Sequence, residues 1–386
     1  MKIVGVICEY NPLHLGHARQ LRYMWELAGE GGAVVCLMSG NFVQRGEPSL
    51  LDKGVRAEAA VRCGANLVLE LPILSALSSA EGFAAAGVDI LTKLGCDTLC
   101  FGCETERLEI LWDTAKLLLS GNFDSLLRLY LKEGISYPAA RQRALETLGG
   151  AGETIVRPNN ILAVEYCKAI LRAGSPMEPH PIHRPGDYHG GTFDPENPSA
   201  ASLRRMAGRG ENWLAYVPEA ARETLQRGTM HTLQAGERAI LSRLRTMKDG
   251  EFEALPYGSE GLWRKFMKNC RKLARVEEIL ETTKSKRYPR TRLNRMLLCA
   301  FLGVTAENLR SPAPYVRALA FDETGSRLLR QAKKSGGLTV VNAGERLENA
   351  YFEMERRAED LYGLFAADAP EPPGGAERRR VYVSGR

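Results

Sequence analysis

The stretch at residues 5–17, GVICEYNPLHLGH, decides how the chain begins to fold. Its first residues belong to an apolar, β-branched run at residues 3–7, which is typical of a buried parallel strand. A polar loop containing Asn11 and Pro12 follows, and residues 13–28 then have the character of a helix that Gly29 is placed to end. The stretch therefore predicts a strand, a loop and a helix in immediate succession.

The same alternation continues to residue 102. Strands alternating with helices form a parallel sheet with crossover helices, so we expect an α/β, Rossmann-like fold. Ligands of such sheets bind at the carboxyl ends of the strands, and the loops at residues 8–17, 39–47 and 101–105 lie at such ends. We therefore expect these loops to converge on one site. The further strands are predicted at residues 33–38, 67–72 and 98–102, and the helices between them at residues 53–63 and 78–94.

The remainder of the chain is expected to be mainly helical. Helices are predicted through residues 105–168 and 199–301. Between them, residues 172–197 are rich in Pro, His and Gly and are expected to form a loop with one or two short strands. One more short strand is predicted at residues 338–341. Residues 345–365 repeat apolar side chains at three- and four-residue steps, which is typical of an amphipathic helix.

Length and composition predict how these elements group into domains. At 386 residues the chain exceeds the usual size of one domain, and 44% hydrophobic residues suffice for normal cores. We expect an α/β domain with a parallel sheet at residues 1–210, followed by a mainly helical, basic domain at residues 211–365. The Pro-, Gly- and Arg-rich tail at residues 366–386 is expected to be disordered.

The chain is expected to stay in the cytoplasm. It contains no apolar run of about 18 residues, so no membrane-spanning helix is predicted. Its start is interrupted too early, by Glu9 and Asn11, to be a signal peptide. The nine cysteines are odd in number and lie mostly in apolar runs, as reduced buried thiols do.

The His14-Leu15-Gly16-His17 segment opens the first predicted helix, where unpaired N–H groups and a partial positive charge favour phosphate. Two imidazoles three residues apart share one face of that first turn. They could donate hydrogen bonds to phosphate oxygens as charge builds up during nucleotidyl transfer. Two other interpretations of this segment are a plain helix cap and a zinc site. A zinc site would need further ligands nearby, which the sequence does not offer, so no dedicated metal site is predicted.

Residues 261–295 form a strongly basic segment. They contain twelve Lys and Arg residues and only three acidic ones. A local field of this sign attracts a polyanion, although the same run also fits a solvated helical face.

The C-x3-C-x2-C spacing of Cys96, Cys100 and Cys103 matches that of an iron–sulfur loop, but we reject this reading. Such a loop needs exposed, flexible backbone, whereas Cys100 lies within a predicted strand and should point into the sheet.

With these motifs assembled, the chain resembles the bacterial tRNA(Met) cytidine acetate ligases, a branch of the HIGH-type nucleotidyltransferases. The most unusual shared motif is MSGNFVQRGEP at residues 38–48. The likeness spans roughly residues 1–300, through residues 9–17, 38–48, 52–53, 69–72, 101–102 and 158–162, Arg184, and residues 286–295.

The resemblance implies an ATP-dependent ligase with a nucleotidyltransferase domain at residues 1–210. ATP, arriving as its magnesium complex, and acetate would form acetyl-adenylate. The N4 amine of the wobble cytidine of elongator tRNA(Met) would then attack the acetyl group, giving N4-acetylcytidine. His14 and His17 would be catalytic. The resemblance implies ATP contacts at Ile7, Cys8, Glu9, Tyr10, Asn11, Pro12, Leu13, His14, Leu15, Gly16, His17, Ala18, Arg19, Gln20, Gly102, Asn159, Asn160 and Arg184.

Considered without the family, several of these residues have ordinary alternatives. Gly102 could be a strand-end turn, and Arg184 a surface loop residue. Either Asn159 or Asn160 could read the nucleotide with its amide, or serve as a helix N-cap. We expect some of the polar residues that follow the second strand (Asn41, Gln44, Arg45 and Lys53) to touch ATP or tRNA.

Nucleotidyltransferases of this type often carry a second, Ser/Thr-rich signature ending in arginine, and its counterpart here is residues 199–204. Ser199 and Arg204 would then hold the triphosphate, although Ala201 stands where a hydroxyl is expected and Ser199 also fits a helix N-cap.

The basic segment would bind the tRNA through Lys286, Arg287, Arg290, Arg292 and Arg295. Two other functions are considered: nucleotide transfer to a small phosphorylated acceptor, which also fits the first motif, and a non-catalytic tRNA-binding module that retains the fold. Chain length and the basic segment favour the ligase over the first, and the intact His14, Gly16 and His17 favour it over the second. The expected partners are acetate and tRNA, with no membrane, and the oligomeric state is not predicted.

Overall fold

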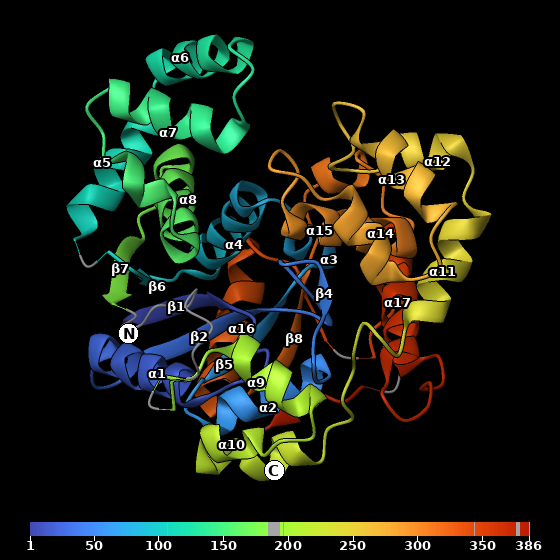
Figure 1. The fold of residues 1–386 in the computed structure, drawn as a ribbon. Helices are drawn as coiled ribbons and strands as arrows, with labels where there is room; N and C mark the ends of the chain where they lie inside the picture. The colour runs from blue at the N-terminus through green and yellow to red at the C-terminus, as the bar shows by residue number, and fades with distance from the viewer. Residues whose placement is uncertain (106, 184–193, 196, 343, 376–378, 386) are drawn as a thin grey trace.

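A computed structural model describes residues 1–386 except 106, 184–193, 196, 343, 376–378 and 386. Among these residues, eight strands form one sheet in the order β10-β8-β5-β2-β1-β6-β7, with β9 also paired to β8 (Figure 1). The neighbours are parallel except at β5 and β8, which run antiparallel. The strands are β1 (Ile3–Cys8), β2 (Ala33–Ser39), β5 (Leu67–Leu71), β6 (Thr98–Cys103), β7 (Glu178–His183), β8 (Val316–Phe321), β9 (Val340–Val341) and β10 (Tyr382–Val383).

Helices cover both faces of this sheet, because alternate residues of the strands point to opposite sides. In β1, Ile3 and Ile7 belong to one core cluster, whereas Val4 and Val6 belong to another. The first cluster includes residues of α4 (Ala80–Leu94), α5 (Leu108–Leu118), α8 (Pro158–Ala173) and α16 (Glu323–Ser335). The second includes residues of α1 (Leu15–Ala28), α2 (Lys53–Arg62), α9 (Ala200–Gly208) and α10 (Glu219–Gln226).

A helical insertion joins the parallel strands β6 and β7. It stands beyond the sheet at the upper left of Figure 1 and ends with α8, which packs on α4 and α5. The insertion consists of α5, α6 (Gly121–Lys132), α7 (Tyr137–Thr147), the 3-10 turn η1 (Gly152–Ile155) and α8.

A second helical unit has its own core. Phe42 and Leu74 belong to this core, so the unit packs against the loop region after β2 and against α3 (Ile73–Ala76). Its helices are α11 (Glu237–Thr246), α12 (Asp249–Glu253), α13 (Leu262–Cys270), α14 (Val276–Thr283), α15 (Arg290–Leu302) and α17 (Ala350–Tyr362). The remaining 3-10 turns are η2 (Trp213–Tyr216), η3 (Asn308–Arg310) and η4 (Gly363–Phe365).

The alternating N-terminal elements and the parallel sheet are confirmed, but the C-terminal part differs from the expectation in two places. Residues 211–365 are not all one helical unit, because β8, α16 and β9 return to the sheet. The tail is ordered where it is described, since Tyr382 and Val383 pair with β8. Backbone pairing with an edge strand outweighs the disorder-prone composition of this tail.

Candidate active site

A cavity of about 750 Å³ lies at the carboxyl ends of β1 and β6. A volume of this size is typical of a small-molecule site. The three loops predicted to converge all contribute to its wall, through His17, Arg45 and Gly102 among others. Helices α1, α8 and α9 begin beside it, since Gly16, Pro158 and Ala200 line the cavity. The dipoles of α1 and α9 make this wall favourable for a polyphosphate, whereas the first N–H groups of α8 are bonded to the Glu104 carboxylate.

The two histidines are held by the first turn of α1. The Nδ1 atom of His14 accepts the Gly16 N–H at 3.1 Å, and the Nδ1 of His17 accepts the His14 N–H at 3.3 Å. Their rings stack with centroids 3.8 Å apart. An Nδ1 that accepts carries no proton, so each neutral ring carries its proton on Nε2. The helix-cap interpretation and the catalytic interpretation are therefore compatible, because Nδ1 caps the helix and Nε2–H can serve as a donor.

Gly16 makes this arrangement possible. A Cβ at this position would lie 2.9 Å from Cε1 of the His14 ring, closer than such contacts occur. The glycine thus makes room for the histidine ring itself, besides leaving the cavity wall bare.

Asn11 joins the first loop to two other parts of the site. Its Oδ1 accepts the Leu50 N–H at 2.7 Å, and its carbonyl accepts Nη1 of Arg204 at 2.9 Å. Arg204 also forms an ion pair with Glu47 at 3.3 Å. The arginine of the second signature therefore contacts the first motif at the cavity.

Ser199 is the N-cap of α9. Its hydroxyl accepts the Ser202 N–H, and the Ser202 side chain bonds back to the Ser199 backbone. Both Ser199 and Ala201 line the cavity, so the turn presents mainly backbone where a further hydroxyl was expected.

The structure separates the two neighbouring asparagines. Asn160 is buried, and its Oδ1 accepts the N–H groups of Glu104 and Thr105 at 2.9 and 3.1 Å. Asn159 lines the cavity and donates from Nδ2 to Oε1 of Glu104 at 2.8 Å. Of the pair, Asn159 lines the cavity and Asn160 fixes the loop after β6.

Most of the predicted ATP contacts line the cavity, but some do not. Lining positions among them are Ile7, Cys8, Glu9, Tyr10, Asn11, His14, Gly16, His17, Arg19, Gln20, Gly102, Asn159, Ser199 and Arg204. Those not in the lining are Pro12, Leu13, Leu15, Ala18 and Asn160, and Leu13 is part of the core instead. Arg184 lies outside the described residues. The sequence prediction missed further aromatic residues of the wall, among them Tyr23, Phe83 and Tyr166. These residues look like ordinary core positions and carry no distinguishing signal.

Glu9 is the carboxylate at the end of β1. Its Oε1 accepts the Gln44 N–H at 2.9 Å. Burial raises the pKa of Glu9 above its ordinary value, although the charges of Arg45 and Arg204 oppose the rise. Glu9 can therefore hold or release a proton inside the cavity.

The cysteines near the site are neutral. Burial raises the pKa of Cys8, which lines the cavity, and raises that of Cys100 to about 12. Cys100 is fully buried in β6, as predicted from the apolar run around it. No group of three or more His, Cys, Asp or Glu side chains suited to a metal ion occurs within the part of the chain that is described.

The motif at residues 38–48 forms a hairpin of β3 (Phe42–Val43) and β4 (Glu47–Pro48), which we call the motif hairpin. Its tip residues Gln44 and Arg45 line the cavity. Of the four polar residues expected near this rim, Asn41 and Lys53 are instead buried beneath the hairpin.

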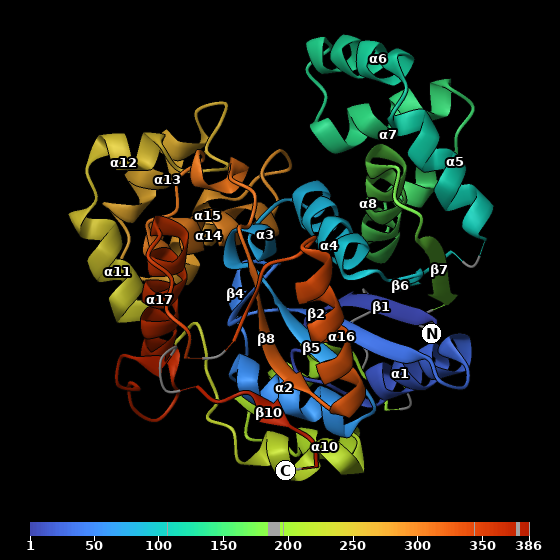
Figure 2. The same cartoon turned by 180° about the vertical axis from the view of Figure 1, so that it is seen from behind.

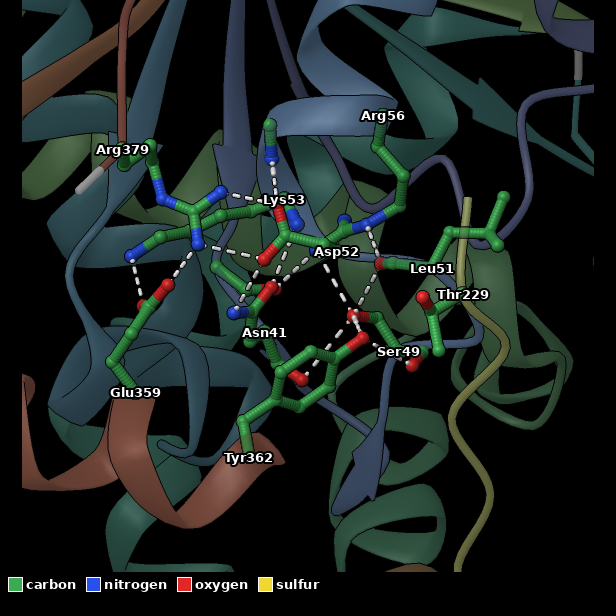
Figure 3. Close-up of polar contacts among 12 residues, drawn as sticks. Asn41, Ser49, Leu51, Asp52, Lys53, Arg56, Thr229, Glu359, Tyr362 and Arg379 are labelled. Carbon is green, nitrogen blue, oxygen red and sulfur yellow. Dashed lines mark hydrogen bonds and ion pairs between the residues drawn. The ribbon is translucent and has the colours of Figure 1, made fainter. Parts of the chain in front are cut away.

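Arg56 anchors the base of the motif hairpin (Figure 3). This fully buried side chain donates to the carbonyls of Glu9, Ser39, Gly40 and Leu51. It thereby fixes the ends of β1 and β2 relative to each other, which sets the shape of the cavity mouth.

With this geometry established, known proteins can be compared. The family described as HIGH Nucleotidyl Transferase matches residues 1–374. A tRNA(Met) cytidine acetate ligase of Clostridium perfringens (strain ATCC 13124) is 34% identical over 94% of this chain and 95% of its own length. That of Geobacillus sp. (strain WCH70) is 34% identical over 96% of both. The chain belongs to the tRNA(Met) cytidine acetate ligase family.

Solved structures of this ligase family agree with the fold. The crystal structure of Thermotoga maritima TmcAL bound with alpha-thio ATP has a TM-score of 0.88 and 29% identity, covering 99% of both chains. The apo form of the same protein has a TM-score of 0.91 at the same identity and coverage.

The basic residues assigned to tRNA binding in this ligase differ in their availability. Arg290 is paired with Glu277 and Glu281 at 2.5 and 2.7 Å, and Arg292 donates to the Tyr257 carbonyl. Arg295 donates to the Gln44 carbonyl at 3.4 Å, and its guanidinium lies 4.9 Å from the centroid of the Tyr257 ring. Lys286 and Arg287 are exposed, although Arg287 pairs with Glu260 at 2.8 Å.

None of the helices in the described residues is both long and apolar enough to cross a bilayer.

Proposed function

We propose that the cavity binds ATP and acetate, forms acetyl-adenylate, and passes the acetyl group to the N4 amine of the wobble cytidine of elongator tRNA(Met). Membership of the ligase family supplies the overall reaction, ATP-dependent acetylation of a tRNA cytidine. The arrangement of His14 and His17 carries the assignment of the site. Their Nδ1 atoms cap α1, and both rings line the cavity at a wall where three helices begin.

In the first step, an acetate oxygen attacks the α-phosphorus of ATP and the bond to the β-phosphate oxygen breaks. Negative charge grows on the phosphate oxygens, and the Nε2–H groups of His14 and His17 stabilise it together with the N–H groups of α1. Arg204 neutralises the departing pyrophosphate from the α9 side. Magnesium enters as part of the ATP substrate.

In the second step, the cytidine N4 attacks the acetyl carbonyl carbon, and AMP leaves as the C–O bond to phosphate breaks. The amine must lose a proton as the amide forms. We assign this proton to Glu9, because burial gives it a raised pKa and its position links β1 to the tip of the motif hairpin.

The tRNA reaches the cavity over the motif hairpin. Helix α15 packs against this hairpin, and Arg295 contacts Gln44, which lines the cavity. The basic face of the helical unit therefore continues to the cavity mouth. Lys286 and Arg287 are the exposed positions best placed to contact phosphates, whereas Arg290 is held by two glutamates.

The direct experiment incubates the protein with ATP, acetate and unmodified elongator tRNA(Met), digests the tRNA and detects nucleosides by mass spectrometry. N4-acetylcytidine that depends on both ATP and acetate is expected. Initiator tRNA(Met) is the matched control and should stay unmodified. Absence of acetylcytidine together with absence of AMP release would refute the proposal.

A further inference from the structure

The C-terminal residues form a strap across the molecule, which we define as residues 371–375 and 379–385 (Figure 2). At its start, the Glu371 N–H donates to the Gly363 carbonyl at 2.9 Å and the Gly374 N–H donates to Asp360 at 2.6 Å. At its end, β10 pairs with β8, and the Arg62 guanidinium lies 5.4 Å from the centroid of the Tyr382 ring. The strap is therefore fixed at both ends, and between them Arg379 contacts Asp52 at the start of α2.

Arg379 is the residue by which the strap enters the interior (Figure 3). Its guanidinium bridges two carboxylates, Asp52 before α2 and Glu359 on α17. Only 13% of the side chain is exposed. Although burial opposes the effect, the charge of Arg379 holds the pKa of Asp52 well below its usual range. Both partners are therefore ionised and held by one side chain.

Asp52 transmits this contact to the base of the motif hairpin. Its Oδ1 caps α2 through the Gly54 N–H, and its Oδ2 accepts Nδ2 of Asn41 at 3.1 Å. The Oδ1 of Asn41 accepts the Lys53 N–H at 2.7 Å, and its carbonyl accepts the Ser49 N–H at 2.9 Å, which closes the hairpin base. One continuous series of polar contacts thus joins the strap to the hairpin.

The same hairpin base is held from α17. The Tyr362 hydroxyl donates to the Ser49 carbonyl at 3.0 Å, and Glu359 pairs with Lys53 at 2.8 Å. At the other end of the hairpin, Gln44 and Arg45 line the cavity. The hairpin that carries these two residues is therefore held at its base by α17 and by the strap.

We propose that Arg379 is a positioning residue for the ligase reaction: through Asp52 and Asn41 it sets the motif hairpin so that Gln44 and Arg45 face the substrates. This inference rests on the proposed role of the cavity. Without Arg379, the buried Glu359 and the partly buried Asp52 keep their charges with Lys53 beside them. An uncompensated buried charge is costly, so the hairpin base rearranges.

The test compares Arg379→Ala and Arg379→Lys with a matched control, Arg380→Ala, which removes the same charge from the neighbouring exposed position. Acetate-dependent ATP–pyrophosphate exchange gives kcat and the KM for ATP. Hydrogen exchange monitors the hairpin, residues 41–49, against α1 as an internal reference. Thermal unfolding reports stability.

Arg379→Ala should lower kcat about tenfold, less than the ~100-fold that a 1 Å misplacement can cost. The KM for ATP should stay within about twofold, because α1 is untouched. Hydrogen exchange should quicken in the hairpin and not in α1. The kcat of Arg379→Lys should lie between those of Arg379→Ala and the wild type. This variant also provides the test if the alanine variant does not fold. Arg380→Ala should match the wild type.

A lower melting temperature with unchanged kcat would overturn the inference, since Arg379 would then be merely structural. So would unchanged hydrogen exchange in the hairpin. If the wild-type protein itself shows no acetate-dependent exchange of pyrophosphate, the proposed function fails separately, and the hydrogen-exchange comparison still decides whether the strap holds the hairpin.

Discussion

The two sides of the cavity are built in different ways. On the α1 side, the bonds that orient His14 and His17 join residues two or three positions apart. On the hairpin side, the bonds run from Asp52 to Arg379 and from Ser49 to Tyr362, across 327 and 313 positions. The side that we assign to phosphate chemistry is thus held by local bonds, whereas the side that we assign to the tRNA is held by bonds to the end of the chain.

If the α1 side carries the chemistry of adenylation, removing its histidines should reduce activity more than any other change. His14→Ala or His17→Ala should each lower acetate-dependent pyrophosphate exchange by about 100-fold or more, the scale of removing one preorganised donor from a transition state. Initial rates at saturating ATP would measure it.

His180→Ala is a matched control for these variants, because this histidine lies on β7 and bonds to Tyr23 rather than lining the cavity. It should retain exchange activity. Near-normal exchange in both α1 variants would contradict the division of labour between the two sides.

Glu9 stands between the two sides, so its replacement tests where they meet. Glu9→Gln should slow acetyl transfer from preformed acetyl-adenylate by about 100-fold, the lower end of general-base effects, and spare adenylation. The base acts when ionised, so the wild-type transfer rate should rise with pH through a pKa above the ordinary glutamate value, where burial places it. Single-turnover rates across pH would show this rise.

The pH dependence of the Glu9→Gln variant shows whether Glu9 acts as the base. In Glu9→Gln the rising limb should vanish while the pH dependence of adenylation is retained. Equal loss of both half-reactions would assign Glu9 to the shape of the site rather than to proton transfer.

This contrast explains how much the sequence could reveal. The strand, loop and helix around residues 5–17 follow from short-range patterns, so α1, the histidines and the converging loops were predictable. Separating Asn159 from Asn160 was not, because both lie in the first turn of one helix and only tertiary bonds to Glu104 and Thr105 distinguish them.

The C-terminal contacts were harder still. Arg379 lies in a run of arginines beside prolines and glycines, a composition that favours disorder. Its importance comes from Asp52 and Glu359, which are distant in sequence and look like ordinary surface acids. Likewise, the net charge of the basic segment gives no sign that Arg290 is neutralised by its neighbours.

Replacing exposed basic residues of the helical unit should have a smaller effect, on tRNA affinity. Replacing Lys286 and Arg287 together by Ala should weaken tRNA binding and reduce the slope of log affinity against log salt by about one to two, because phosphate contacts are lost. Binding isotherms at several salt concentrations would measure the slope, with the KM for ATP unchanged. Arg290→Ala is the internal comparison. It should change the slope less because two glutamates hold its partly buried guanidinium, whereas the exposed Arg287 pairs with one and Lys286 is exposed. A larger change for Arg290 would place the tRNA on a different face.

The smallest expected effect concerns stability where the sheet meets α17. Glu355 accepts hydrogen bonds from the Tyr315 hydroxyl at 2.6 Å and the Ile73 N–H at 3.3 Å. Burial and the charge of Glu70 raise the pKa of Glu355 to about 7. The folded protein therefore favours the protonated acid. This contribution is present at low pH and is lost as pH rises from the ordinary glutamate range through about 7.

Glu355→Gln keeps a neutral side chain at every pH. It should raise the melting temperature above that of the wild type by roughly 2–4 °C near pH 8 and change it little near pH 5. Glu353→Gln, on the exposed face of the same helix, is the control and should show no such pH-dependent difference. A gap between Glu355→Gln and the wild type that is the same at both pH values would mean that the carboxyl is ionised throughout. The long-range side of the site would then carry one more negative charge for Lys53, Arg317 and Arg379 to balance.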